Sequence, residues 1–273
     1  MAAIAFAFTQ PASFRRSSPL ERHPGQFPAA PAAPETSAMP HVATPTLTVD
    51  IENVPPGYLE RGTAFSFGNH LWFTARHVAT AGCDQVVFLD KDKRIPGRVA
   101  FADPDADLAV LIAPDESAPA LPIESAAVSD DEHAYAFGYP KGMLGGTEDM
   151  LLGRAELKLA GRLNGMAPVL AWTEVARYPD DLESIAGISG GPMIDASGKV
   201  IGIIVAASVR RGRNYSVAPE MIEAIAKKFG ASRDATPARD ALAPPVALDR
   251  AAEALSKNMR IAEIYCVPPR PPS

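Results

Sequence analysis

A serine enclosed by glycines is the strongest chemical signal in the sequence, in the segment Gly187-Ile188-Ser189-Gly190-Gly191-Pro192. Glycine adopts positive φ angles and lets other atoms approach its backbone, so amide N–H groups in such a loop can converge beside the hydroxyl. Each donor aimed at a developing oxyanion lowers an activation barrier by about 3–4 kcal/mol. The segment therefore predicts Ser189 as a nucleophile, with the amides of Gly187 and Ser189 as an oxyanion hole.

A nucleophilic serine needs a base, and one of the five histidines is well placed to supply it. His77 follows the apolar segment Leu71-Trp72-Phe73-Thr74 and precedes a short helix-like turn from Val78 to Ala81. At such a junction the backbone is fixed while the side chain can face a cleft. The other histidines lie in a proline-rich segment, at an expected turn or after an acidic run: His23, His41, His70 and His133. His77 is therefore the predicted general base.

A third residue must hold the imidazole in the right tautomer and stabilise its cation, which requires a carboxylate. Asp107 directly precedes the apolar run Leu108-Ala109-Val110-Leu111-Ile112, where an acid at the entrance of a strand can point inward. Asp103 and Asp105 are the alternatives, but proline and loop residues surround them, as in solvated turns. We therefore predict Asp107 for this role.

The elements that must position these residues are short strands. Between residues 57 and 229, β-branched and aromatic segments alternate with Gly, Asp and Pro. This pattern indicates two small antiparallel barrels of about six strands each, and not a sheet alternating with helices. The expected strands are 62–67, 71–74, 85–89, 98–101 and 108–112 in the first barrel, and 134–138, 153–160, 169–174, 193–195, 200–205 and 214–217 in the second. The fold class is therefore all-β, with C-terminal helices.

The flanking segments differ in composition. Residues 1–56 are rich in Pro and Ala without apolar periodicity, which predicts a disordered leader. Residues 230–247 are expected to be a linker, and residues 248–273 a helix and a proline-rich tail. Apolar residues share one face of the helices expected at 220–229 and 248–262. The first should pack on the domain, and the second should either dock in cis or bind a partner.

Five segments in this order resemble the trypsin-like peptidases, especially the bacterial and organellar branch related to the HtrA proteases. They are Gly62-Thr63-Ala64-Phe65, Thr74-Ala75-Arg76-His77-Val78, Asp107-Leu108-Ala109-Val110-Leu111, Gly138-Tyr139-Pro140 and the glycine-rich serine segment. The order His, Asp, Ser is the one that this fold family uses. The resemblance covers residues 58–229 and implies a chymotrypsin-like fold. His77 and Asp107 would come from the first barrel and Ser189 from the second, with a substrate cleft between them.

The activity that the resemblance implies is that of a serine endopeptidase, which hydrolyses peptide bonds through an acyl-enzyme and needs no metal or organic cofactor. Ile188 stands where digestive members have an aspartate, so activation by release of a new N-terminus is not expected. No PDZ-like segment follows Phe229. The alternative function is a catalytically silent binding module with the same fold.

The resemblance also places a primary specificity pocket between two segments. Its expected wall residues are Ile204, Val205, Ala206, Ala207, Tyr215, Ser216 and Val217. Such walls favour a modest aliphatic side chain at P1, the substrate residue before the cleaved bond. Glu183 is the alternative determinant, because an acid that reached the base of the pocket would select a basic P1 residue.

Charge and apolar content narrow the partners and the compartment. The 26 basic and 32 acidic residues give a net charge of −6, which argues against binding to nucleic acid. No apolar stretch approaches the roughly 18–20 residues that a membrane span needs. A protein or peptide substrate is therefore the expected partner, and a soluble, cytoplasmic protein is favoured because no convincing signal peptide is present. Cys83 and Cys266 are expected to be two reduced thiols, although they could pair.

Overall fold

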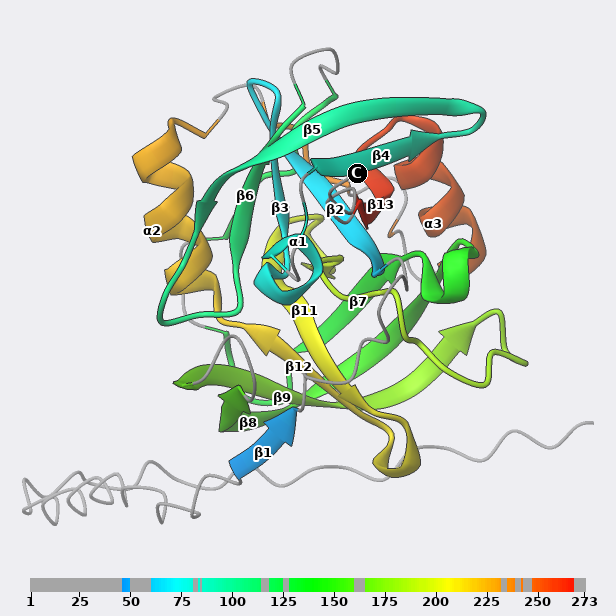
Figure 1. The fold of residues 1–273 in the computed structure, drawn as a ribbon. Coiled ribbons are helices and arrows are strands. Elements are labelled where there is room, and N and C mark those ends of the chain that lie inside the picture. Colours follow the sequence, from blue (N-terminus) through cyan, green and yellow to red (C-terminus); the bar gives the residue numbers. More distant parts are fainter. Residues whose placement is uncertain are drawn as a thin grey trace, which may run out of the picture. The chain divides into compact units, whose positions relative to one another are not determined.

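Two closed antiparallel barrels make up most of the fold (Figure 1), which is known from a computed structural model. The structure describes residues 46–49, 60–80, 83, 85–113, 118–124, 128–159, 165–231, 235–238, 242 and 247–267. The prediction of two six-stranded barrels is confirmed.

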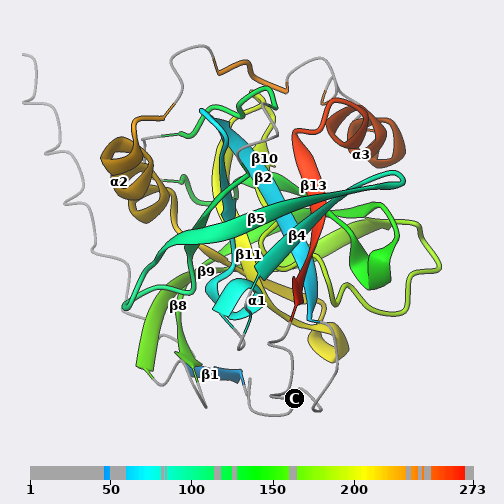
Figure 2. The same cartoon turned by 45° about the horizontal axis from the view of Figure 1, so that its top comes forward.

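The first barrel has the strand order β13-β2-β3-β6-β5-β4. Its strands are β2 (Arg61–Gly68), β3 (Leu71–Thr74), β4 (Gln85–Asp90), β5 (Lys93–Ala102), β6 (Ala109–Ile112) and β13 (Ile261–Val267). The short helix α1 (Arg76–Thr80) follows β3 directly. In Figures 1 and 2 this helix lies close to a strand of the other barrel, β11.

The second barrel has the order β8-β7-β10-β11-β12-β9 and is closed by pairing of β8 with β9. Its strands are β7 (His133–Gly138), β8 (Gly145–Leu159), β9 (Gly165–Tyr178), β10 (Pro192–Asp195), β11 (Val200–Ser208) and β12 (Arg213–Val217). Two short 3-10 turns, η1 (Pro140–Gly142) and η3 (Val209–Arg211), follow β7 and β11. β8 and β9 are much longer than the sequence indicated. They form a hairpin with one solvent-exposed face, where polar residues alternate with apolar ones, and this alternation made the strands hard to recognise.

A strand also forms within the segment expected to be a disordered leader. β1 (Thr46–Val49) pairs in parallel with Glu156–Leu159 of β8. Its sequence, Thr-Leu-Thr-Val, has high β-propensity, and the surrounding prolines concealed it. The rest of residues 1–56 lies outside the described residues.

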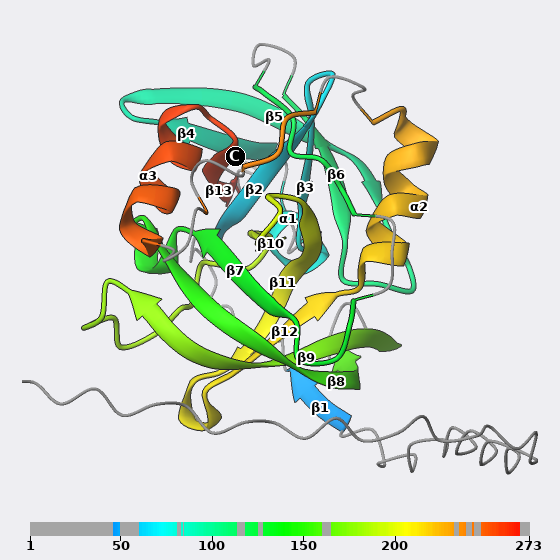
Figure 3. The same cartoon turned by 180° about the vertical axis from the view of Figure 1, so that it is seen from behind.

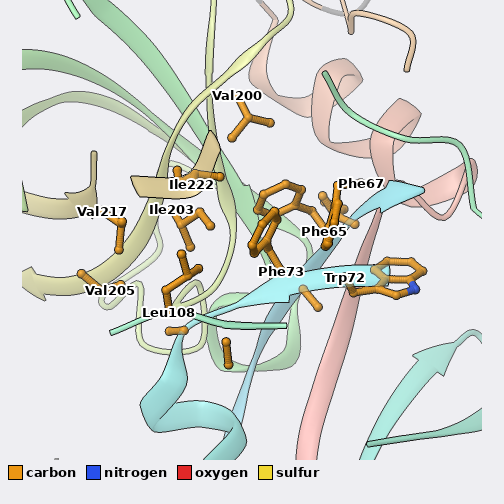
Figure 4. Close-up of a cluster of buried hydrophobic side chains, with 14 of the residues drawn as sticks. Phe65, Phe67, Trp72, Phe73, Leu108, Val200, Ile203, Val205, Val217 and Ile222 are labelled. Carbon is orange, nitrogen blue, oxygen red and sulfur yellow. The ribbon is translucent and has the colours of Figure 1, made fainter. Parts of the chain in front are cut away.

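An aromatic and aliphatic core joins the two barrels (Figure 4). Phe67 and Phe73 stack with ring centroids 4.1 Å apart, and Phe65 lies 5.6 Å from Phe73. Ile203 and Val205 of β11 belong to the same buried cluster. The helix α2 (Pro219–Phe229) packs on this core through Ile222, as the expected amphipathic pattern required.

The C-terminal segment completes the first barrel, and the predicted end of the domain at residue 229 is therefore wrong. β13 pairs with β2 on one side and with β4 on the other (Figure 2). The sequence pattern indicated only five strands for this barrel, and β13 is the sixth. It was missed because the helical spacing from Leu248 was extended to residue 262. The helix ends instead at Lys257, and Met259 adopts a φ of 52°.

The helix α3 (Leu248–Lys257) docks in cis. Its apolar face, formed by Ala251, Ala252 and Leu255, is buried in the main core. The hydroxyl of Tyr139, just after β7, donates a hydrogen bond to Ser256 Oγ over 2.9 Å. Figure 3 shows α3 and α2 on opposite sides of the barrels. The face that could have held a partner therefore covers the chain's own barrels.

The two cysteines form a disulfide, so the expectation of two reduced thiols is wrong. Cys83 and Cys266 have Cα atoms 5.2 Å apart although 183 residues separate them in sequence. Their separation in sequence suggested no contact. Because β13 pairs with β4, however, Cys266 lies next to the segment that follows α1. The bond fastens the last strand of the barrel to the chain just after His77.

The disulfide should stabilise the fold, because it closes a very long loop in the unfolded chain. Replacing both Cys83 and Cys266 with serine should lower the free energy of unfolding by about 2–5 kcal/mol. Urea denaturation without reductant would measure the loss. Dithiothreitol should destabilise the wild type by a similar amount and leave the double variant unchanged. Equal stabilities of the oxidised wild type and the variant would contradict this role.

Candidate active site

Asp107 holds His77 by two hydrogen bonds. Asp107 Oδ1 accepts from the backbone N–H of His77 over 2.8 Å, and Oδ2 lies 2.6 Å from His77 Nδ1. The side chain of Asp107 is 1% exposed and that of His77 is 12% exposed. Because an ionised carboxylate can only accept, the proton sits on Nδ1 and Nε2 is left free to accept another proton.

The surroundings of His77 favour its protonated form. Burial by itself lowers the pKa of His77, but the charge of Asp107, its hydrogen bond and the charge of Glu60 together outweigh burial. The pKa of His77 therefore lies above its ordinary value of 6.5. An imidazolium formed by taking a proton from a nucleophile would be stabilised at this position.

The alternative carboxylates serve a turn instead. Asp103 Oδ1 accepts from the backbone N–H groups of Asp105 and Ala106 over 2.9 and 3.0 Å. Asp105 is exposed. Their turn carries the chain to Asp107, two residues before β6. The Arg76 guanidinium donates to the carbonyl oxygens of Asp103 and Pro104.

The loop of Ser189 is packed against the first barrel so tightly that only glycine fits at one position. A Cβ on Gly190 would lie 2.1 Å from the Thr63 carbonyl oxygen and 2.3 Å from Thr74 Oγ1, and its φ is 87°. A Cβ on Gly62 would touch Val78, the neighbour of His77, at 2.6 Å and the Ser189 carbonyl oxygen at 3.0 Å. The chain around Ser189 and the chain around His77 therefore meet at Gly62.

Thr63 connects the two barrels at this point. It is fully buried, and its N–H donates to the Ser189 carbonyl oxygen over 2.8 Å. Its Oγ1 donates to the Gly187 carbonyl oxygen over 2.9 Å and accepts from the Tyr139 N–H over 3.0 Å. Thr63 belongs to one of the five family-like segments, but its role was not predicted, because a threonine in a strand has no distinctive signal.

Two amides of the serine loop are left without a partner among the described residues. The N–H groups of Ile188, Gly190 and Gly191 donate to the carbonyl oxygens of Ile185, Ile204 and Ile188. No hydrogen bond is recorded in the described part of the chain for the N–H groups of Gly187 and Ser189. Gly187 has a φ of 106°, a conformation that favours glycine. The two amides predicted for an oxyanion hole are thus available to a ligand.

The predicted pocket walls lie on two adjacent strands. Ile204 pairs with Ser216, Ala206 with Tyr215 and Ile203 with Val217. All of the wall residues except Ala207 are buried: Ile204, Val205, Ala206, Tyr215, Ser216 and Val217. They divide between two cores, because Ile204 packs inside the second barrel while Val205 and Val217 belong to the main core.

Glu183 lies on the surface. Its side chain is 87% exposed and its Oε2 is 3.5 Å from Lys141 Nζ. In this position the carboxylate does not reach the interior of the second barrel, and the ion pair with Lys141 satisfies it at the surface.

A family model described as a trypsin-like peptidase domain matches residues 62–203, just over half of the chain. The matched segment contains His77, Asp107 and Ser189. The chain belongs to the trypsin-like peptidase family. Among the described residues, no helix of this peptidase-family chain is both long and apolar enough to cross a bilayer.

Two curated relatives are similar to this trypsin-like peptidase chain. Serine protease Rv3671c of Mycobacterium tuberculosis (strain ATCC 25618 / H37Rv) is 29% identical over 173 residues, which are 61% of this chain and 42% of that protein. Serine protease MT3772 of strain CDC 1551 / Oshkosh gives the same values. The chain therefore spans about two fifths of the length of these relatives.

Solved structures agree with the two-barrel fold. The active form of the Rv3671c protease from M. tuberculosis has a TM-score of 0.52 and 22% identity, over 64% of this chain and 76% of that one. The inactive form of the Rv3671c protease has a TM-score of 0.51 and 23% identity, over 63% of this chain and 88% of that one. At this identity the likeness concerns the fold alone.

Loss of the Thr63 hydroxyl should disturb the serine loop. Thr63→Val keeps the shape of the side chain but leaves the Gly187 carbonyl oxygen and the Tyr139 N–H unpaired, which should cost about 2–4 kcal/mol of unfolding free energy. Thr63→Ser keeps the hydroxyl and is the matched control. Urea denaturation would measure both. A Thr63→Val variant as stable as Thr63→Ser would show that the two hydrogen bonds contribute little.

Proposed function

We propose that the protein is a serine endopeptidase that hydrolyses peptide bonds in proteins or peptides. Ser189 is the nucleophile, His77 the general base and Asp107 the residue that orients His77. One observation carries the proposal. Asp107 accepts hydrogen bonds from both the backbone and the ring of His77, and the backbone of Ser189 packs against Gly62, which also contacts Val78 next to His77. Membership of the trypsin-like peptidase family supports it.

Acylation follows from the hydrogen bonds at His77. With its Nδ1 proton held by Asp107, His77 accepts the Ser189 hydroxyl proton at Nε2 while Oγ attacks the substrate carbonyl carbon. The free amides of Gly187 and Ser189 donate to the oxyanion that forms. His77 then gives its proton to the leaving amine, and the C–N bond breaks.

Deacylation uses the same groups in reverse. His77 removes a proton from water, the hydroxide attacks the acyl carbon, and Ser189 leaves with the proton that His77 returns. The imidazolium occurs twice in the cycle, so the raised pKa of His77 favours both stages. Asp107 remains an ionised acceptor throughout.

A fluorophosphonate probe would test the nucleophile directly. The wild type should become covalently labelled, because the probe reacts with an activated serine and mimics the oxyanion. Ser189→Ala should abolish labelling while keeping the wild-type unfolding free energy. A well-folded wild type that takes up no probe would contradict the proposal and favour the binding-module alternative.

The pH dependence of the labelling rate should report the proton of His77. The group must be neutral to act as a base, so its raised pKa predicts a rate that falls below a midpoint above pH 6.5. Asp107→Asn removes the charge that raises the pKa, so the midpoint should move to lower pH. Holding the wrong tautomer should also slow labelling on the order of 10³–10⁴-fold.

The same titration affects stability in a defined direction. Because the pKa of His77 is higher in the folded state, its contribution is complete below pH 6.5 and is lost as the pH rises through the folded-state pKa. The free energy of unfolding, measured across this pH range for the wild type and for Asp107→Asn, is the control. An unchanged labelling midpoint in the variant would remove Asp107 from the proposed role.

A further inference from the structure

A buried polar cluster lies inside the second barrel, away from His77 and Asp107. Thr147 and Asp149 of β8 are 0% exposed, and Asn214 of β12 is 1% exposed. Asp149 Oδ2 accepts from Thr147 Oγ1 over 2.5 Å, and Asp149 Oδ1 accepts from Asn214 Nδ2 over 2.6 Å. No lysine or arginine in the described part of the chain forms an ion pair with Asp149. A buried carboxylate without a cation is costly, so a function for it must be sought.

Strand pairing connects this cluster to the serine loop through β12 and β11. Asn214 is paired with Trp172 of β9, and Trp172 Nε1 donates to Ser216 Oγ over 2.9 Å. Ser216 is two residues from Asn214 on the same face, and it pairs with Ile204. The N–H and C=O of Ile204 bond in turn to Gly191 and Gly190, directly after Ser189. The cluster is thus one strand residue beyond the expected pocket wall.

One atom of the cluster lacks a partner. Asn214 Oδ1 is buried and accepts no hydrogen bond within the described residues. In its ionised form Asp149 can only accept, so it then binds the amide nitrogen of Asn214 and fixes which way the amide faces. Asp149 lies on β8, beyond β9, and the other neighbour of β12 is β11, which carries part of the expected pocket wall. A buried acceptor without a donor is costly, and a ligand that brings a donor would complete it.

We propose that Asn214, oriented by Asp149 and Thr147, forms the polar end of the primary specificity pocket and selects substrates whose P1 side chain ends in a hydrogen-bond donor. This inference rests on the proposed peptidase function. It replaces Glu183, which lies on the surface beside Lys141, as the acid that influences P1. Asn214 contacts the substrate, and Asp149 is a positioning residue.

The state of Asp149 bears on which donors are preferred. Burial raises the pKa of Asp149 to about 7, although the hydrogen bonds from Thr147 and Asn214 lower it, and the charges of Glu174 and Glu148 raise it further. Near neutral pH the charged and neutral forms are therefore close to balance. A cationic P1 group would favour the charged form, whereas an amide donor needs only the Asn214 oxygen.

The test uses peptides that differ only at P1: lysine, glutamine and norleucine. Norleucine has the length of the lysine chain without a donor. For the wild type we expect kcat/KM to be about 10-fold or more higher for lysine or glutamine than for norleucine. The comparison of lysine with glutamine separates a charge effect from a donor effect. Fluorophosphonate labelling rates, measured in parallel, report the catalytic groups independently of P1.

Variants separate selection from stability. Asn214→Leu has a similar volume and no acceptor, and it should reduce the preference for donors to about 1-fold. Asp149→Asn no longer fixes the Asn214 amide, so it should weaken the same preference. Glu183→Gln is the matched control and should keep the wild-type preference. A merely structural role would lower the rate for all three peptides equally and leave their ratio unchanged.

The outcomes distinguish this inference from the proposed function. A wild type that labels but does not prefer donors, or an Asn214→Leu variant that keeps the preference, would overturn the inference alone. If Asn214→Leu does not fold, Asp149→Asn decides, because an unchanged ratio there contradicts the positioning role. A folded wild type that neither labels nor cleaves any peptide would overturn both.

Discussion

The hydrogen bonds of Thr63 are the constraint on which the arrangement of the active site depends. This one residue, at the start of β2, binds backbone groups of Gly187 and Ser189 in the second barrel and of Tyr139 after β7. Thr63 itself is fully buried, so a shift of either barrel would leave several polar groups unpaired at once. The close packing of Gly190 against the Thr63 carbonyl oxygen adds a steric limit. The serine loop is therefore held against the barrel that carries His77 and Asp107.

Closure of the first barrel by the last strand gives the C-terminal segment a direct part in the active-site scaffold. β13 lies between β2, which carries Thr63, and β4, and its Cys266 is bonded to Cys83 shortly after α1. Glu263 of this strand pairs with Arg61 over 2.5 Å, and α3 before it docks on the core. β13 therefore pairs with β2, which precedes His77 in the chain, and with β4, which follows it. The disulfide also links β13 covalently to the segment after α1.

The second barrel combines two kinds of interior. Most of it is apolar, with Trp172, Ile188 and Met193 fully enclosed, as expected for a small barrel filled by side chains. Within this apolar interior, Asp149, Thr147 and Asn214 form a polar cluster in which Asn214 Oδ1 accepts no hydrogen bond from the described residues. Natural folds keep such exceptions where they serve recognition or catalysis, because an apolar replacement would usually be more stable. The chemistry of Ser189 and the selection of its substrate would then come from neighbouring parts of one barrel.

The sequence by itself indicated the candidate catalytic residues and the strands whose pattern is local. The glycine-rich serine loop, His77 at a strand end, Asp107 before β6 and the two-barrel class all follow from residue types and short-range spacing, because turns and strand propensity act over a few residues. Only the tertiary structure decided the sixth strand of the first barrel, the Cys83–Cys266 bond, the burial of Asp149 and the role of Thr63. Each of these depends on contacts between residues far apart in the chain, and such contacts leave no periodic signal. Glu183 illustrates the same limit, since its position near Ser189 in sequence did not bring its carboxylate into the barrel.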